Sequence, residues 1–416
     1  MKKLDFLPES GPLRPIEGGF TAARKFVAAG ISCGIKSEDV LDLALLVSLR
    51  PASAAGAYTT NSAAAAPVRL CRERLADGAL QAVVVNSGAA NACTGREGDR
   101  DARSMAAAAA RCLGLPETSV TACSTGTIGR RLPLDRILPG VEVLAGIVAS
   151  GGNDRAAQAI MTTDTVPKEA AVEFELEGKT VRVGGMAKGA GMIHPRLRVG
   201  EPSPHATMLS FISTDAGISA GALRRALAGS LEQSFNRVTV DGDTSTNDTV
   251  IVMANGACGA GVEEGTPGWE LFRRALDAVT HELARAIAAD GEGATKLVRF
   301  DVTGAAGPDE ARTVAAAVAN SLLLKCALFG ESPNWGRVLA AIGYSGTGVE
   351  PETVSVRLDG IEVVAGGLLT GTDPDAVAKA LSAGRLDIVI DLGRGKDRDF
   401  YYTCDISHEY VGINRH

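Results

Sequence analysis

Two segments of the chain alternate apolar and polar residues on both sides of a tight turn. In residues 169–185 the turn is at Glu177-Gly178-Lys179, and in residues 354–364 it is at Asp359-Gly360. This pattern is typical of a β-hairpin, whose antiparallel strands each turn one face to the core. A purely parallel sheet is therefore excluded, and the fold must hold antiparallel strands beside its helices.

Further strand-like and helix-like segments are mixed along all 416 residues. We expect additional strands over residues 81–87, 119–124, 206–214, 249–254, 297–303 and 387–392. We expect helices over residues 101–114, 220–236, 269–290, 310–329 and 375–384. The sequence has no short repeat and no flexible linker, and its densest Pro and charge cluster, Arg196 to His205, lies near the midpoint. The fold class is therefore a mixed α/β (α+β) arrangement of layered sheets with helices.

The composition is that of a soluble globular protein with a net charge of −7. An acidic chain with scattered basic residues argues against nucleic acid or an anionic membrane as the main partner. No apolar run reaches membrane-spanning length, and no signal peptide is indicated. The eight Cys residues form no CxxC pair, and the five His residues show no HxxxH or HExxH spacing. We therefore expect a cytoplasmic protein with reduced thiols, no metal site and no cofactor.

Two kinds of nucleophile are compatible with the motifs. The GISAG stretch, Gly217 to Gly221, matches the GxSxG pattern between a strand and a helix. We interpret Ser219 as the cap of the helix that begins at Ala220, because no Asp-His pair follows it. The second option is a Thr that becomes an N-terminus, whose α-amino group, with a pKa near ~8, acts as base for its own hydroxyl. Ala206-Thr207, behind the Pro-rich cluster, is such a pair.

Several long motifs carry a family resemblance. They are NSGAANACTG (86–95), STGTIGR (124–130), AIMTTDT (159–165), MAKGAGMIHP (186–195), ATMLSFISTDA (206–216), DGDTSTNDT (241–249), DGEGATK (290–296), PNWGR (333–337), and near the end DLGRG, CDIS and EYVGIN. They occur in order and cover nearly the whole chain. On these motifs the chain resembles the ornithine acetyltransferases, also called glutamate N-acetyltransferases.

The resemblance implies a self-cleaving acyltransferase of the N-terminal-nucleophile type. Cleavage between Ala206 and Thr207 would give an alpha chain of residues 1–206 and a beta chain of residues 207–416. The two fragments would stay together as one αβ unit, and two units would usually pair. The enzyme would pass an acetyl group from N-acetylornithine to glutamate in arginine biosynthesis, and some members of the family also accept acetyl-CoA.

The resemblance also assigns roles to single residues. Thr207 would be the nucleophile that carries the acetyl group, and Thr125 and Gly126 would form the oxyanion hole. Thr207 would also contact substrate. The other substrate-binding residues would be Thr162, with Thr163 as a competing candidate, Lys188, Glu292 and Asn414.

The chain departs from the family pattern at two places. Ten residues, 196–205, separate His194-Pro195 from Ala206, about eight more than the family usually has, although a longer loop costs little free energy. The sequence also ends two residues after Asn414, where the family usually continues to a further Ser or Thr. Two alternatives therefore stay open: an N-terminal-Thr amidohydrolase or acyltransferase with another substrate, and an unprocessed, non-catalytic homologue.

Overall fold

The computed structural model describes residues 11–149, 151–200 and 208–415. The chain forms two compact units. The first holds residues up to Asn236 together with Thr244–Ile287, and the second holds Arg237–Asp243 together with Ala288–His416. Each unit has its own sheet and its own core, and the two are described separately below.

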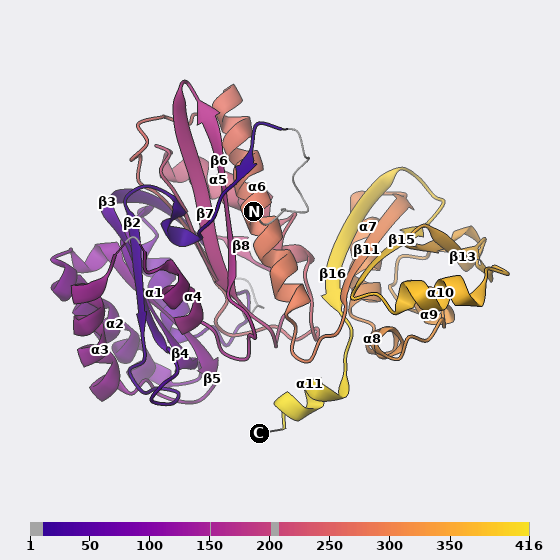
Figure 1. The fold of residues 1–416 in the computed structure, drawn as a ribbon, viewed down its shortest axis with the longest axis horizontal. Helices are drawn as coiled ribbons and strands as arrows, with labels where there is room; N and C mark the ends of the chain where they lie inside the picture. Colours follow the sequence, from indigo (N-terminus) through magenta and orange to yellow (C-terminus); the bar gives the residue numbers. More distant parts are fainter. Residues whose placement is uncertain (1–10, 150, 201–207, 416) are drawn as a thin grey trace. The chain divides into compact units, whose positions relative to one another are not determined.

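The first unit is built on a sheet of mixed direction (Figure 1). Its strands are β1 (Arg14–Pro15), β2 (Phe26–Ile31), β3 (Leu43–Tyr58), β4 (Ala79–Ala89), β5 (Val120–Thr127), β6 (Lys168–Leu176), β7 (Lys179–Lys188), β8 (Arg198–Val199), β9 (Leu209–Thr214) and β10 (Thr249–Ala254). Its helices are α1 (Ala66–Arg74), α2 (Gly95–Leu113), α3 (Leu134–Ile147), α4 (Asn153–Ala159), α5 (Ala220–Leu231) and α6 (Pro267–Ala289). Short 3-10 turns lie at Phe20–Ala22, Glu117–Ser119 and Phe235–Arg237.

The order of this sheet is β1-β6-β7-β9-β10-β3-β4-β5, with β2 and β8 also paired to β3. Strand β9 runs antiparallel to β7 and parallel to β10, and β4 runs parallel to β5. The sheet therefore joins segments on both sides of residue 206, because β9 and β10 lie between β7 and β3.

Both faces of the sheet are covered around β3 and β4. Val83 and Val85 face one apolar cluster, which includes side chains from α1 and α4. Ala82 and Val84, which alternate with them along β4, face a second cluster with side chains from α2 and α3. Figure 1 shows these helices gathered around β2 to β5. A strand buried on both faces reads as a continuous apolar run, which is what AVVV (82–85) in β4 is.

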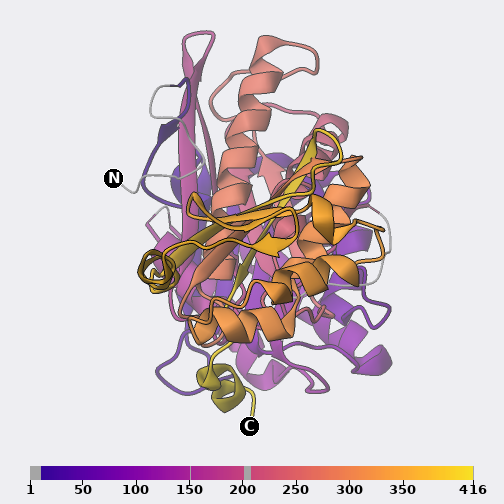
Figure 2. The same ribbon diagram turned by 90° about the vertical axis from the view of Figure 1, so that its right-hand side faces the viewer.

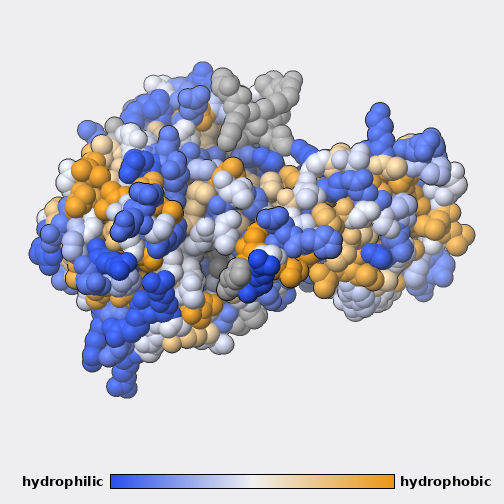
Figure 3. Space-filling view, turned by 60° about the horizontal axis from the view of Figure 1, so that its bottom comes forward, coloured by the Kyte–Doolittle hydropathy of each residue, from blue (hydrophilic) through white to orange (hydrophobic). Residues whose placement is uncertain are grey.

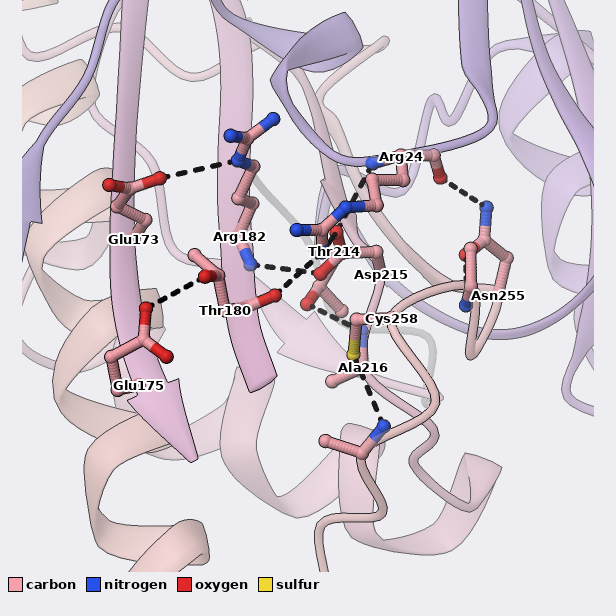
Figure 4. Close-up of polar contacts among 12 residues, drawn as sticks. Arg24, Glu173, Glu175, Thr180, Arg182, Thr214, Asp215, Ala216, Asn255 and Cys258 are labelled. Atoms are coloured by element: carbon pink, nitrogen blue, oxygen red, sulfur yellow. Dashed lines mark hydrogen bonds and ion pairs between the residues drawn. The ribbon is translucent and has the colours of Figure 1, made fainter. Parts of the chain in front are cut away.

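A buried ion pair fixes the end of β9 that lies beyond Thr214. Asp215 is fully buried, and its carboxylate accepts a bond from the Arg24 guanidinium at 2.9 Å and from the Arg182 main-chain nitrogen at 2.8 Å. The Arg24 guanidinium also donates to the Thr180 carbonyl at 2.6 Å (Figure 4). This network ties the turn before β2 to the sheet, because a buried carboxylate needs such partners.

The second unit is a smaller sheet with helices on it (Figure 2). Its strands are β11 (Leu297–Ala305), β12 (Ser355–Leu358), β13 (Ile361–Ala365), β14 (Leu368–Leu369), β15 (Arg385–Asp391) and β16 (Asp397–Cys404). Its helices are α7 (Pro308–Ala319), α8 (Leu322–Phe329), α9 (Gly336–Gly343), α10 (Pro374–Leu381) and α11 (His408–Ile413), with a 3-10 turn at Pro351–Thr353. Val298, Phe300 and Val302 of β11 face the core.

The expected fold class is confirmed. Both predicted hairpins form, as β6–β7 and β12–β13, and β10 has the predicted bounds of residues 249–254. The single helix predicted over residues 310–329 is wrong. It is two helices, α7 and α8, because Ser321 caps a new helix by accepting a bond from the Leu324 nitrogen.

Among the described residues, no single helix is long and apolar enough to cross a membrane. The bent pair α7 and α8, which turns by 56°, meets the length and composition criteria only when taken together.

Candidate functional site

Lys188 is the centre of a buried polar cluster in the first unit. It is the last residue of β7 and pairs with Leu209 at the start of β9. Its side chain is almost fully buried, and its Nζ atom donates to Oγ1 of Thr162 at 2.7 Å and to Oγ1 of Thr125 at 3.3 Å. The structure thus brings together three of the residues that the sequence analysis singled out, from β5, β7 and the segment after α4.

Asp164 supplies the negative charge beneath this lysine. One of its oxygens lies 3.7 Å from Lys188 Nζ, and the other accepts bonds from Lys168 Nζ at 2.7 Å and from the Gly189 nitrogen at 2.6 Å. Burial alone would raise the pKa of Asp164, but the charges of Lys188 and Lys168 outweigh it and hold that pKa well below its usual range. The carboxylate is therefore ionised at neutral pH and keeps two lysines in place.

Thr125 is held by the end of β5 and by a side-chain network below it. Asn247 donates to the main-chain oxygens of Ser124 at 2.8 Å and Ala90 at 2.6 Å. The Ser124 hydroxyl donates to Asn86 at 2.6 Å. Since the Thr125 hydroxyl accepts the bond from Lys188, its own proton remains to be donated to another group. That is the property an oxyanion-hole hydroxyl needs.

Gly126, the next residue, has a local structural reason to be glycine. Its φ of +127° is in the region that side chains rarely adopt, and a Cβ atom would lie 2.4 Å from the main-chain carbon of Gly88 on β4. The residue is exposed while Thr125 is buried, so the strand leaves the core at this point. An exposed main chain beside a positioned hydroxyl is compatible with the oxyanion role expected of this pair.

The expected nucleophile and cleavage site, Thr207 and Ala206, lie outside the described residues. Met208, which follows Thr207 in the sequence, is fully buried, and its carbonyl accepts a bond from the Thr249 nitrogen at 2.9 Å. Asp248, next to Thr249, is fully buried as well, and neither carboxyl oxygen has a hydrogen-bond partner among the described residues. Burial raises the pKa of Asp248 well above its usual value, against the opposing charge of Lys188.

Glu292 and Asn414, both in the second unit, are in direct contact. The side-chain nitrogen of Asn414 donates to a Glu292 carboxylate oxygen at 2.6 Å. Glu292 lies between Gly291 and Gly293, and the Ser407 hydroxyl donates to the Gly293 carbonyl at 2.6 Å. Burial, followed by the charges of Asp241 and Glu292, raises the pKa of the nearby Tyr410 phenol. This part of the second unit therefore carries clustered negative charge, which suits a cationic amine.

The alternative nucleophile, Ser219, has the structural role that the sequence predicts. Its hydroxyl accepts a bond from the Ala222 nitrogen at 3.3 Å and caps α5. A surface pocket of about 310 Å³ lies beside it, lined by residues 217–219, 222 and 261–264. This lining has no histidine, so the helix-cap interpretation of Ser219 is confirmed without a catalytic partner in the pocket.

Sequence reasoning did not single out Asp164, Lys168, Asn247 or Asp248. All four are buried polar residues, and Asp164, Asn247 and Asp248 stand inside the motifs MTTD and STNDT. Their signal was a charged or amide side chain within an otherwise apolar or small-residue stretch, where burial demands a partner. Which partner each one meets is decided by the sheet order, which no local pattern reveals.

The comparisons with known proteins agree with the motifs. The family model described as the ArgJ family matches residues 27–416. The arginine biosynthesis bifunctional protein ArgJ of Symbiobacterium thermophilum is 48% identical over 402 residues, covering 96% of this chain and 98% of the relative. Its counterpart in Caldanaerobacter subterraneus is 44% identical over 404 residues, covering 96% and 98%.

Two solved structures are also similar in sequence. The arginine biosynthesis bifunctional protein from Bacillus halodurans is 42% identical, covers 50% of this chain and 99% of its own, and has a TM-score of 0.49. The ornithine acetyltransferase of Mycobacterium tuberculosis, in complex with ornithine, is 45% identical, covers 44% and 99%, and has a TM-score of 0.42. The resemblance drawn from the motifs is confirmed by the family match and by the curated relatives, and the chain belongs to the ArgJ family.

Proposed function

We propose that this chain transfers the acetyl group of N-acetylornithine to glutamate, giving ornithine and N-acetylglutamate in arginine biosynthesis. Membership of the ArgJ family, whose relatives are named arginine biosynthesis bifunctional proteins, supports this reaction. We also propose acetyl-CoA as a second donor, in keeping with the word bifunctional in those names. The structural observation that carries the proposal is the buried Lys188 ammonium between the hydroxyls of Thr125 and Thr162.

In the proposed mechanism, the Thr207 hydroxyl attacks the acetyl carbonyl carbon of N-acetylornithine. The Thr207 α-amino group takes the hydroxyl proton and passes it to the ornithine nitrogen as the carbon–nitrogen bond breaks. Thr125 and Gly126 bind the negative oxygen that develops on the carbonyl. The amine of glutamate then attacks the acetyl ester, and the Thr207 oxygen regains its proton.

Self-cleavage between Ala206 and Thr207 precedes this cycle and gives the fragments 1–206 and 207–416. The sheet supports a stable pairing of these fragments. Strands β9 and β10 would belong to the second fragment, and they hydrogen-bond to β7 and β3 of the first. A cut before residue 207 would leave these ladders intact, so the fragments would stay together without a covalent link.

We further propose that two αβ units associate. Exposed large apolar side chains of the second unit supply candidate contacts: Leu322, Leu323, Tyr344, Leu368 and Leu369. Figure 3 shows one face of the molecule, on which hydrophobic residues in orange form patches among hydrophilic ones. Light scattering tests this proposal, because the paired form has twice the 42.7 kDa mass of one chain.

We propose that the reaction takes place in the cytoplasm. All eight cysteines are free thiols, which suits a reducing compartment.

Glu292 and Asn414 are proposed to bind the amine end of ornithine, and Thr162 and Lys188 its carboxylate end. A carboxylate side chain suits a cationic amine, and an ammonium side chain suits a carboxylate.

Intact mass under denaturing conditions, with N-terminal sequencing, tests the first step. The expected result is two fragments, the second beginning at Thr207. Acetyl transfer is then measured with N-acetylornithine, with and without glutamate. Release of acetate without glutamate would favour the amidohydrolase alternative. A single uncut chain with no transfer would favour the non-catalytic one. Thr207→Ala should abolish both cleavage and transfer, and transfer by that variant would overturn Thr207 as nucleophile.

A further inference from the structure

Lys36 lies beside the candidate site, although no motif in the sequence draws attention to it. It belongs to the segment between β2 and β3 and is half-buried. Its stem packs on the bare face of Gly88, where a Cβ atom would lie 3.1 Å from Lys36 Cγ. Gly88 in turn is the strand neighbour of Gly126. The Lys36 side chain therefore packs on the strand residue that pairs with Gly126, the expected oxyanion residue.

The charged end of Lys36 reaches the other side of the same site. Its Nζ atom donates to the carbonyl of Met161 and, at 3.2 Å, to that of Leu41. Met161 precedes Thr162, whose hydroxyl contacts Lys188 at 2.7 Å. An ammonium group has three donors, so one remains after these two bonds are counted. Lys36 thus presents a donor and a positive charge at Met161, the residue next to Thr162.

The charges around Lys36 leave room for an anion. The charged groups that act on it are the carboxylates of Asp42 and Asp164 and the ammonium of Lys188. Asp42 is occupied, since it accepts bonds from the main-chain nitrogens of Cys33, Ile35 and Lys36. Asp164 is shared between Lys188 and Lys168. The described cluster therefore holds three lysines and only two carboxylates, so a substrate carboxylate would bring the two kinds of group to equal number.

We propose that Lys36 is a second substrate-binding lysine, which together with Lys188 receives the α-carboxylate of the amino-acid substrates. This inference rests on the proposed function and extends it, because it names which end of the substrate enters between Gly126 and Thr162. Two ammonium groups on one carboxylate fix its position better than one, and both N-acetylornithine and glutamate carry that carboxylate. The same subsite would therefore serve both halves of the reaction.

Lys36 also gives the site a pH dependence. Burial lowers the pKa of Lys36 to about 8; the nearby carboxylate of Asp42 opposes this shift, and the charge of Lys188 adds to it. Below that pH the side chain is charged and binds a carboxylate, and above it the charge is lost. Affinity for the substrates should therefore weaken as the pH rises through about 8.

The experiment compares the wild type with Lys36→Met, Lys36→Arg and a control, Lys179→Met. Lys179 also donates to a main-chain carbonyl, that of Gly259 at 2.5 Å, but it is exposed and stands at the opposite end of β7 from Lys188. Steady-state KM and kcat for N-acetylornithine and glutamate are measured between pH 6.5 and about 9.5, a range that brackets the unperturbed α-amine and lysine pKa values.

The expected result is a KM for both substrates raised about tenfold or more in Lys36→Met, with kcat changed far less. The wild-type KM should rise above pH 8, and Lys36→Arg should remove that rise because arginine stays charged. Lys179→Met should match the wild type. An unchanged KM in Lys36→Met would overturn the proposal. So would a loss of kcat and thermal stability without a change in KM, since that is the result of a purely structural role.

Calorimetric titration with ornithine separates this inference from the proposed function. If the wild type binds ornithine but does not transfer acetyl, the proposed function fails. The Lys36 subsite is then still tested by comparing ornithine affinity between wild type and Lys36→Met. Equal affinities would overturn the role of Lys36, and an affinity at least about tenfold weaker in the variant would support it. A wild type that binds no ornithine would overturn both.

Discussion

The Nζ atom of Lys188 lies 2.7 Å from Oγ1 of Thr162, and this contact joins the end of β7 to the segment after α4. Thr162→Val removes the hydroxyl while keeping the shape of the side chain. A hydrogen bond to a charged group contributes about 1.5–3 kcal/mol, so we expect KM for N-acetylornithine to rise by about tenfold or more. Steady-state kinetics check this. Thr163→Val, at the exposed neighbouring residue, is the matched control and should leave KM unchanged.

Lys188→Met should lower the stability of the fold. Burial alone would raise the pKa of Asp164, but the charges of Lys188 and Lys168 hold it below its usual range, so its charge stabilises the fold above the unfolded pKa of about 3.9. That stabilisation is lost as the pH falls through the folded pKa. Removing Lys188 should lower the free energy of unfolding at pH 7 by about 1–3 kcal/mol.

Urea unfolding of Lys188→Met and wild type at a series of pH values is the measurement. The difference in free energy of unfolding between the two proteins should be largest near neutral pH. It should become smaller in acid, as Asp164 takes up a proton. A difference that is constant with pH would show that Lys188 contributes by packing and not through the charge of Asp164.

Gly126→Ala should disturb the end of β5. The added Cβ atom would meet the Gly88 main-chain carbon at 2.4 Å, so one of the two strands must move. Strain of this kind costs about 1–3 kcal/mol, and the displacement of Thr125 should lower kcat by about 100-fold. Gly129→Ala is the control, because Gly129 also has a positive φ, +82°, but has open space around it. If both variants lose the same stability and the same kcat, then the positive φ, and not the contact with Gly88, is the reason that residue 126 is glycine.

The elements that the sequence predicts well are those whose signal is local. Residues 249–254 form β10 as predicted, because an unbroken apolar run with β-branched residues has few other solutions. No element was predicted over residues 43–58, although they form one long strand, β3. Pro51 and the small residues around it weaken the strand pattern there. The register of β3 against β4 shifts between Val47 and Ala52, and such an irregularity is where a strand tolerates proline.

The candidate site divides in the same way. Thr125, Gly126, Thr162 and Lys188 could be taken from motifs, and the structure brings their elements together. Lys36 and Asp248 could not be selected as site residues from the sequence, because the residues around them come from distant parts of the chain. Lys36 packs on Gly88 and donates to the Met161 carbonyl. Asp248 precedes β10, which is brought to the site by its pairing with β9. Strand order is set by packing across the whole unit, so a local pattern cannot reveal these contacts.

Glu292 and Asn414 should act as a coupled pair. Asn414 donates to the Glu292 carboxylate at 2.6 Å, so Asn414→Ala removes a partner of that charge. We expect Glu292→Gln and Asn414→Ala each to weaken ornithine binding. The double variant should lose less binding free energy than the sum of the losses in the two single variants. Such contacts give coupling energies of about 0.5–3 kcal/mol. A double-mutant cycle by calorimetry measures this, and strictly additive losses would show that Asn414 does not act through Glu292.

Asp248→Asn should make the protein more stable at and above neutral pH. Burial raises the folded pKa of Asp248, with Lys188 opposing, so the native state holds a proton that the unfolded chain releases above about pH 3.9. Wild-type stability therefore falls as the pH rises from the unfolded towards the folded pKa, and asparagine lacks this penalty. Thermal unfolding between pH 5 and about 9 should show that the Tm of the variant, relative to that of the wild type, increases as the pH rises.

Asp215→Asn provides the contrast for this last prediction. Asp215 is equally buried, but its carboxylate accepts bonds from Arg24 and Arg182, so its replacement should destabilise the protein by about 1–3 kcal/mol. Replacement by asparagine should thus stabilise the protein at Asp248 and destabilise it at Asp215. If Asp248→Asn is also destabilised, and equally at every pH, then Asp248 is ionised and partnered in solution, and the neutral carboxyl inferred from its burial is wrong.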